Sequence, residues 1–206
     1  MAEKFDIHQL YDATTPEELR AAYDSWARDY DTQIMDGGWN GHIRLAAEAV
    51  PHLARTMKVL DAGAGSGLLG ALLKTAGFRT IDALDASPGM LEVARGKGIY
   101  GQCVAAFLGE PLAFADDSYD AVLGAGVFTP GHAPPGSFDE LIRIVRPGGV
   151  IAFTLRHDRP PKGFHEAMAG HEKAGRWIRI SCSAPWQSLP RYEPEVHHEA
   201  WIWRVA

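Results

Sequence analysis

The sequence contains few cysteines, no long apolar run and no excess of positive charge. Cys103 and Cys182 are the only cysteines among 206 residues. Two are too few for a disulfide framework and show no metal-ligand spacing, so we expect both to be reduced and buried and no metal to be bound. No apolar run approaches the ~18–20 residues that a membrane span needs, and the first residues lack the layout of a signal peptide. The sequence therefore predicts a cytoplasmic protein with no membrane partner.

Positive charge is in deficit as well. The chain has 20 Lys and Arg residues against 26 Asp and Glu residues, a net charge of -6 at pH 7. Proteins that bind phosphate backbones need a basic field, so we expect no nucleic-acid partner. The hydrophobic share of 46% is typical of a globular chain, and the length is that of one domain. We expect a single domain over 1–206, as a monomer or homodimer.

The segment 1–56 is predicted to form N-terminal helices that cap the rest of the domain. Thr15, followed by Pro16, is typical of a helix start, and this helix is expected to run to about Tyr30. Two glycines at 37–38 interrupt the pattern, and Asn40 is expected to cap a second helix.

The remainder, 57–206, is predicted to be the cofactor-binding core. Strands are expected at 59–60, 81–85, 102–107, 119–124 and 150–155, with helices at 68–76, 87–96 and 137–145. Strands that alternate with helices favour parallel crossovers and an α/β fold. Two late strands, at 177–180 and 201–205, have no helix between them, which indicates an antiparallel addition at the sheet edge.

Three glycines at alternate positions follow the first core strand, in the segment DAGAGSG at 61–67. Glycine permits positive φ and close approach of a ligand, and the next helix N-terminus presents free amides. Asp85 ends the following strand, where a carboxylate can accept hydrogen bonds from ribose hydroxyls. Loop and carboxylate together predict a nucleoside site. Because GSGLLG at 65–70 also fits the dinucleotide pattern, a nicotinamide-dependent oxidoreductase is one alternative.

Four motifs, in order, resemble those of class I S-adenosylmethionine-dependent methyltransferases. They are DAGAGSG at 61–67, LDAS at 84–87, FADDSYD at 114–120 and RPGG at 146–149. Within that family, the segments at 23–31 and 131–135 look most similar to the methyltransferase-like proteins named for the Williams–Beuren deletion region. The resemblance implies a Rossmann-like, doubly wound, seven-stranded sheet that is mostly parallel, with an antiparallel last strand and helices on both faces.

The resemblance also implies which residues hold S-adenosylmethionine and its product S-adenosylhomocysteine. Asp61 and the loop 63–67 would hold the methionine part, and Asp85 would hold the ribose. Ala86 and Met90 would pack on the adenine. The family often has an acidic residue after the third strand, where this chain has Leu108. The implied cofactor site comprises Asp61, Ala62, Gly63, Ala64, Gly65, Gly67, Asp85, Ala86, Ser87, Met90, Leu108, Gly109, Glu110, Gly124 and Ala125.

The segment 124–132, after the fourth strand, is where methyl group and acceptor are expected to meet. Enzymes that methylate exocyclic amino groups of nucleic-acid bases resemble one another in an Asn/Asp-Pro-Pro-aromatic tetrad at this place. The segment lacks this tetrad, which argues against a nucleic-acid base as substrate. His132 on this loop and His157 after the fifth strand are candidate general bases. Each also has a structural interpretation, since His132 can hold the Pro-rich turn and His157 can be an exposed loop residue.

Aromatic residues recur at helical spacing in the N-terminal segment, at Tyr23, Trp26 and Tyr30. This spacing places all three on one helical face. We expect Trp26 in the core. For Tyr23 and Tyr30 two interpretations stay open, closure over the active site as catalytic candidates or an amphipathic stripe packed on the sheet.

We therefore expect an enzyme that transfers the methyl group of S-adenosylmethionine to a small-molecule acceptor by in-line displacement. The cofactor fold uses nearly the whole chain, so only the N-terminal helices and rim loops remain to form a substrate pocket. Two other functions stay open. The chain could methylate a protein, or it could be a non-catalytic regulatory protein that binds S-adenosylmethionine or S-adenosylhomocysteine.

Overall fold

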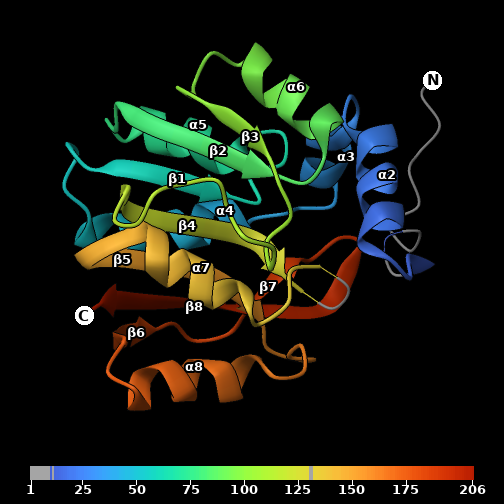
Figure 1. Ribbon diagram of the computed structural model, residues 1–206. Helices are drawn as coiled ribbons and strands as arrows, with labels where there is room; N and C mark the ends of the chain where they lie inside the picture. The colour runs from blue at the N-terminus through green and yellow to red at the C-terminus, as the bar shows by residue number, and fades with distance from the viewer. Residues whose placement is uncertain (1–9, 11, 130–131) are drawn as a thin grey trace.

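The computed structural model describes residues 10, 12–129 and 132–206. An eight-stranded sheet forms the centre of the molecule, with helices packed on both of its faces (Figure 1). The strands are β1 (Lys58–Ala62), β2 (Thr80–Asp85), β3 (Cys103–Ala105), β4 (Tyr119–Phe128), β5 (Val145–Arg156), β6 (Trp177–Cys182), β7 (Trp186–Leu189) and β8 (Glu193–Val205). Their order is β3-β2-β1-β4-β5-β8-β6, and β7 pairs with β8.

The first five strands are parallel, as the alternating pattern predicted, and β8 is antiparallel to both β5 and β6. The mostly parallel sheet with an antiparallel last strand is therefore confirmed. Two details differ from expectation. The antiparallel strand β8 lies inside the sheet rather than at its edge, which β6 occupies, and the short strand β7 was not predicted.

The helices are α2 (Pro16–Trp26), α3 (Tyr30–Asp36), α4 (Gly41–Ala49), α5 (Leu68–Thr75), α6 (Pro88–Gly96), α7 (Ser137–Ile144) and α8 (Phe164–Lys173), with a short 3-10 helix at Val50–His52. Two predicted caps are confirmed, because Thr15 Oγ1 accepts from the Glu18 amide at 3.1 Å and Ser87 Oγ from the Met90 amide at 3.0 Å. The helix expected to reach about Tyr30 stops at Trp26.

Asn40 precedes α4 as expected, but its side chain makes no capping bond with the described residues. Its amide nitrogen instead donates to the Gln187 carbonyl at 3.0 Å, and its Oδ1 accepts from Trp186 Nε1 at 2.8 Å. The residue therefore fastens the N-terminal helices to β7, a contact between segments far apart in the chain.

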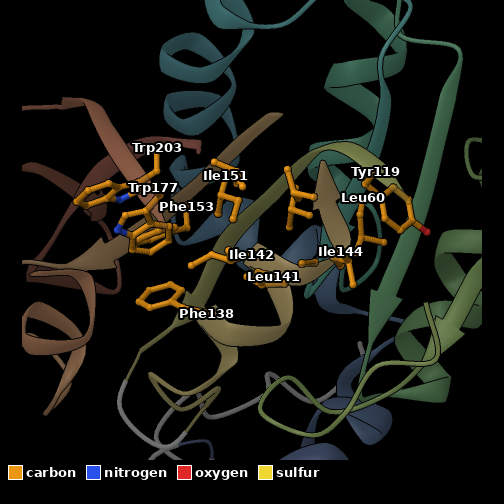
Figure 2. Packing of buried hydrophobic residues seen from close by; sticks show 14 of the residues in the cluster. Leu60, Tyr119, Phe138, Leu141, Ile142, Ile144, Ile151, Phe153, Trp177 and Trp203 are labelled. Atoms are coloured by element: carbon orange, nitrogen blue, oxygen red, sulfur yellow. The ribbon is translucent and has the colours of Figure 1, made fainter. Parts of the chain in front are cut away.

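Apolar side chains cover both faces of the sheet. On one face, residues of β1, β4, β5, β6 and β8 pack against α7 and α8, and Phe138, Phe153, Trp177 and Trp203 form an aromatic group there (Figure 2). The indole rings of Trp177 and Trp203 stack with centroids 4.5 Å apart. On the other face, Leu45 and Leu73 belong to a second buried cluster with Val59 of β1. This two-sided burial is what a parallel sheet requires.

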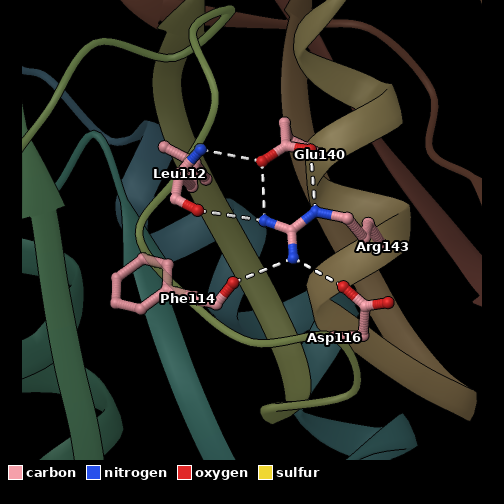
Figure 3. Close-up of polar contacts among 5 residues, drawn as sticks. All are labelled: Leu112, Phe114, Asp116, Glu140 and Arg143. Carbon is pink, nitrogen blue, oxygen red and sulfur yellow. Dashed lines mark hydrogen bonds and ion pairs between the residues drawn. The ribbon is translucent and has the colours of Figure 1, made fainter.

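Arg143 of α7 fastens the connection between β3 and β4 (Figure 3). Its guanidinium donates to the carbonyls of Leu112 at 3.0 Å and Phe114 at 2.8 Å, and to the Asp116 carboxylate at 2.7 Å. Glu140 holds the same guanidinium and accepts from the Leu112 amide at 2.7 Å. Because residues earlier in this connection line the cavity described below, Arg143 steadies one of its walls.

The cysteines differ from expectation. Both are free, but Cys103 is only partly buried and Cys182 is exposed. Cys182 is the last residue of the edge strand β6, of which only Trp177 is buried. None of the helices in the described parts of the chain is long and apolar enough to cross a membrane.

Candidate active site

Two adjoining cavities open at the carboxyl ends of the parallel strands. The first has a volume of about 400 Å³ and is walled by α2 and the loops after β1, β2, β3 and β4. The second has a volume of about 90 Å³ and is walled by the N-terminal helices and the ends of β4, β5, β7 and β8. Ligands of open α/β sheets bind at this edge.

The glycine loop after β1 lies against the first cavity. Gly63, Gly65 and Gly67 all have positive φ, at 71°, 53° and 95°. A Cβ on Gly63 would come within 2.6 Å of Val127 Cγ2, whereas a Cβ on Gly65 would meet nothing within 4 Å. Packing therefore requires glycine at 63. At 65 the conformation favours glycine and leaves the main chain open to a ligand.

Asp85, at the end of β2, lines the first cavity and bonds to the loops on either side of it. One carboxylate oxygen accepts from the Gly65 amide at 2.7 Å and the other from the Ser87 amide at 2.8 Å. Burial raises the pKa of Asp85, although these amide bonds act in the opposite direction. Since a carboxylate has about four acceptor sites, Asp85 retains capacity for a further donor.

Asp61, at the end of β1, is buried behind the loop and lies outside the cavity wall. Its Oδ2 accepts from the Tyr100 hydroxyl at 2.7 Å and from the Gly70 amide at 3.1 Å. Burial raises the pKa of Asp61 to about 7, and the two hydrogen bonds limit this rise. A Cβ on Gly70 would lie 2.2 Å from the Tyr100 oxygen, so Gly70 makes room for this contact.

Two carboxylates tie the N-terminal helices to the loops below. Asp24 of α2 accepts from Ser87 Oγ at 2.5 Å and from the Gly89 amide at 2.8 Å. Asp31 of α3 accepts from Ser66 Oγ and pairs with Lys97 Nζ at 2.6 Å. The helices therefore close over the cavities through specific polar contacts as well as through apolar packing.

Tyr23 and His132 stand where the two cavities meet, since both residues line both spaces. The Tyr23 hydroxyl lies 2.8 Å from His132 Nε2, and Thr129 Oγ1 lies 2.9 Å from His132 Nδ1. Tyr30, Ala125 and Gly126 also belong to both walls. The imidazole is thus held between two hydroxyls at the junction.

Comparison with known proteins identifies the fold and the family. Residues 60–153 match the family model described as methyltransferase domain. Human methyltransferase-like protein 27 is 34% identical over 164 residues, covering 75% of this chain and 66% of that protein. The chain belongs to the class I S-adenosylmethionine-dependent methyltransferases. The resemblance drawn from the sequence motifs is therefore confirmed.

Two further relatives of this methyltransferase show how far the likeness extends. The demethylmenaquinone methyltransferase of Clavibacter sepedonicus is 31% identical, covering 66% of this chain and 57% of that protein. The Burkholderia thailandensis 1,6-didemethyltoxoflavin-N1-methyltransferase, solved with 1,6-didemethyltoxoflavin and S-adenosylhomocysteine, superposes with a TM-score of 0.68 at 20% identity, covering 100% of this chain and 93% of that one. The chain spans 66% and 57% of the lengths of the two curated relatives.

S-adenosylmethionine is the cofactor of this methyltransferase family, and the first cavity fits it. Asp85 has acceptor capacity left for a ribose hydroxyl beyond its amide contacts. Met90, Leu84 and Leu108 supply apolar walls for a flat base. Gly65 leaves the main chain uncovered beside them. A volume of about 400 Å³ lies within the range of cofactor sites.

The methyltransferase cavity collects most of the predicted site residues, but not all. Those on the wall of the first cavity are Gly63, Gly65, Asp85, Ala86, Ser87, Met90, Leu108, Gly109, Glu110 and Ala125, together with Tyr23, Tyr30 and His132. Those outside it are Asp61, Ala62, Ala64, Gly67, Gly124 and His157. Of this second group, Asp61 and Gly67 shape the loop from behind, since Asp61 bonds to α5 and Gly67 precedes that helix.

His157 lines neither cavity, unlike His132, which lines both. It follows β5 as expected, but its side chain is 51% exposed and its Nδ1 pairs with Glu199 Oε2 at 3.1 Å. Tyr23 and Tyr30 reach the cavity, whereas Trp26 is 3% exposed in a core cluster, as predicted.

Several wall residues were missed by the sequence reasoning. Arg20 and Phe107 line the first cavity, and Arg156, Ser188, Glu193 and His198 line the second. Ser188, Glu193 and His198 belong to strands without a recognised motif, and only the tertiary fold brings them to α2. In the described parts of the chain, no group of three His, Cys, Asp or Glu side chains could hold a metal ion.

Proposed function

We propose that this methyltransferase acts on a small-molecule acceptor. The observation that supports the proposal is the second cavity, which adjoins the cofactor cavity at Tyr23 and His132. An acceptor placed there would lie beside the cofactor cavity, under helices α2 and α3. A space of about 90 Å³ accommodates a compact group and not a folded partner.

Bound S-adenosylmethionine supplies a methyl group on a sulfonium sulfur, which keeps the bonding electron pair when the methyl group passes to the acceptor. The chain's own residues have to align the acceptor and exclude water. Asp24 and Asp31 contribute to both tasks, because they hold the N-terminal helices over the site.

Tyr23 and His132 are proposed to remove the proton of the acceptor. When the Nδ1–H of His132 donates to Thr129 Oγ1, Nε2 carries the lone pair and accepts from the Tyr23 hydroxyl. An acceptor hydroxyl or amine at the junction would pass its proton to the Tyr23 oxygen while the Tyr23 proton moves to His132. This arrangement avoids leaving charge on the acceptor at the end of the reaction.

The remaining proposed roles concern the cofactor. Asp85 would hold the ribose hydroxyls, and Ala86, Met90 and Leu108 would contact the adenine. Gly63 and Gly65 would present their main chain to the methionine part. Asp61 supports that loop from behind through Tyr100 and the Gly70 amide.

Relatives that are named for small-molecule acceptors add support. The 31% identical relative from Clavibacter sepedonicus is named a demethylmenaquinone methyltransferase, so a related domain acts on a small molecule. For this chain we propose only the same class of acceptor, a small molecule, and not the same compound.

Incubation with methyl-labelled S-adenosylmethionine and a cell extract tests the proposal. After the reaction, the extract is separated into an ultrafiltrate of small molecules and a retained protein fraction. We expect the label in the ultrafiltrate. Label in the protein fraction alone would establish a protein methyltransferase instead, and no labelling despite calorimetric binding of S-adenosylhomocysteine would favour a regulatory binding protein.

A further inference from the structure

The second cavity has aromatic walls and a buried polar end. Tyr23, Trp26, Tyr30 and Trp39 line it from the N-terminal side. At the other side lie Arg156 of β5 and His198 of β8, which are cross-strand neighbours. Both are buried, at 7% and 3% exposure. A flat molecule that enters between the aromatic rings would meet these polar groups.

His198 has one ring nitrogen bonded and one unpaired. Its Nδ1 lies 2.7 Å from Ser188 Oγ, whereas its Nε2 is buried and finds no hydrogen-bond partner among the described residues. A buried polar atom without a partner costs about 1–3 kcal/mol and calls for an explanation. Of the buried unpaired side-chain atoms in residues 10, 12–129 and 132–206, only His198 Nε2 belongs to a wall residue of the second cavity.

The contacts of Ser188 assign the protons on this ring. Ser188 Oγ also lies 3.4 Å from the Val196 carbonyl, which can only accept. Both contacts are satisfied when the serine hydroxyl donates to Val196 and His198 Nδ1–H donates to Ser188. Nε2 then carries a lone pair, so the group that it lacks is a donor, an N–H or O–H.

The charges around His198 favour an uncharged ligand group. Arg156 is held by Asp158, with Nη2 to Oδ2 at 3.0 Å, and Glu193 adds a buried carboxylate to the same wall. The formal charges on the wall are thus of opposite sign. Burial, and next the charge of Arg156, lower the pKa of His198 to about 4, so its imidazole is neutral at neutral pH.

We infer that the second cavity binds the end of the acceptor remote from the methylated atom, through an uncharged N–H or O–H group that donates to His198 Nε2. The acceptor class is then a flat, uncharged ring compound with a hydroxyl or amino group at each end. One group meets Tyr23 at the junction, and the other meets His198. This inference rests on the proposed function.

The volume sets how much of the acceptor the cavity takes. A cavity of about 150 Å³ encloses one benzene molecule, so about 90 Å³ holds a substituent and part of a ring. The rest of the ring lies at the junction, which the two cavities share. A compact acceptor therefore reaches both His198 and Tyr23.

Matched probes test the inference on the protein loaded with S-adenosylhomocysteine. The probes are 4-hydroxybenzyl alcohol, its near-isostere 4-ethylphenol, which lacks the far hydroxyl, and 4-hydroxybenzoate, which carries a charge there. Titration by protein NMR gives affinities and, in the wild type, the imidazole ¹⁵N signals of His198. We expect the alcohol to bind about fivefold more tightly than 4-ethylphenol and the benzoate more weakly than both, because one neutral hydrogen bond is worth roughly 1 kcal/mol. The alcohol alone should shift the His198 Nε2 signal.

His198→Phe keeps the ring shape and should abolish the preference for the alcohol. His197→Phe is the matched control, because His197 is the neighbouring residue of β8 and its Nδ1 bonds to the Glu195 carbonyl. It should keep the preference. If His198→Phe fails to fold, the wild-type Nε2 signal decides.

The inference is overturned if 4-ethylphenol or the benzoate binds as well as the alcohol, if no probe binds, or if the Nε2 signal stays unchanged. Each of these results leaves binding of S-adenosylhomocysteine intact. Failure to bind S-adenosylhomocysteine would overturn the proposed function itself.

Discussion

The two cavities are built in different ways. The wall of the first comes mainly from loops directly after β1, β2, β3 and β4, and one polar contact of Asp85 there is with its near neighbour Ser87. The wall of the second joins both ends of the chain, from Tyr23 to His198. A site made of strand-end loops carries its signature in local sequence, whereas a site assembled by packing does not.

The largest expected effect concerns the buried carboxylate behind the first cavity. Its pKa is about 7 in the folded protein, against an ordinary value of 3.8. The folded state therefore binds the proton more tightly than the unfolded chain, so stability falls as the pH rises from about 4 to about 7. At about 1.4 kcal/mol per pKa unit, Asp61 accounts for a loss on the order of 4 kcal/mol.

Asp61→Asn removes this titration while its oxygen still accepts from Tyr100 and Gly70. Urea denaturation at a series of pH values should show wild-type stability decreasing from about pH 4 to about pH 7, with a flatter dependence for the variant. Asp85 also has a raised pKa, but it is present in both proteins and cancels in the difference. Equal slopes would show that Asp61 does not carry the effect.

The next effect is on cofactor binding. Asp85→Ala removes the acceptor proposed for two ribose hydroxyls and releases the Gly65 amide. Each bond to a charged group is worth roughly 1.5–3 kcal/mol, so calorimetry should show the affinity for S-adenosylhomocysteine falling more than a hundredfold.

Asp82 is the matched control for Asp85, since it is a buried aspartate on the same strand that bonds to Gln102 and Tyr119 away from the cavity. Asp82→Ala should lower stability and leave the affinity near the wild-type value. An Asp85→Ala protein that binds normally would refute the ribose assignment.

A smaller effect is expected at the junction, on catalysis alone. General acid–base catalysis contributes about a hundredfold or more, so His132→Ala should lower kcat by about that factor and Tyr23→Phe by about tenfold. Both should leave the affinity for S-adenosylhomocysteine unchanged. A kcat of His132→Ala close to the wild-type value would assign His132 a structural role.

Local physics explains which features could be predicted. Thr15 and Ser87 cap helices through bonds to amides three residues further along the chain. Gly63, Gly65 and Gly67 adopt positive φ within one loop. Neighbouring residues are therefore enough to predict these features. Strand β7 could not be predicted in this way, because Asn40 holds its Trp186 from the far end of the chain. Arg156 and His198 likewise meet only through the pairing of β5 with β8.

The smallest effect is expected at His157, which the sequence places on the same rim as His132. Half of its side chain is exposed, so solvent screens its contact with Glu199, and the buried Glu199 carboxylate keeps its bond from Trp201 Nε1 at 2.9 Å. His157→Gln should therefore leave kcat, cofactor affinity and melting temperature close to wild-type values. A loss of kcat comparable to that of His132→Ala would place His157 in the acceptor path and would mean that the site extends beyond the two cavities. Unchanged kinetics would separate the two histidines by their surroundings, since only His132 stands between two hydroxyls at the junction.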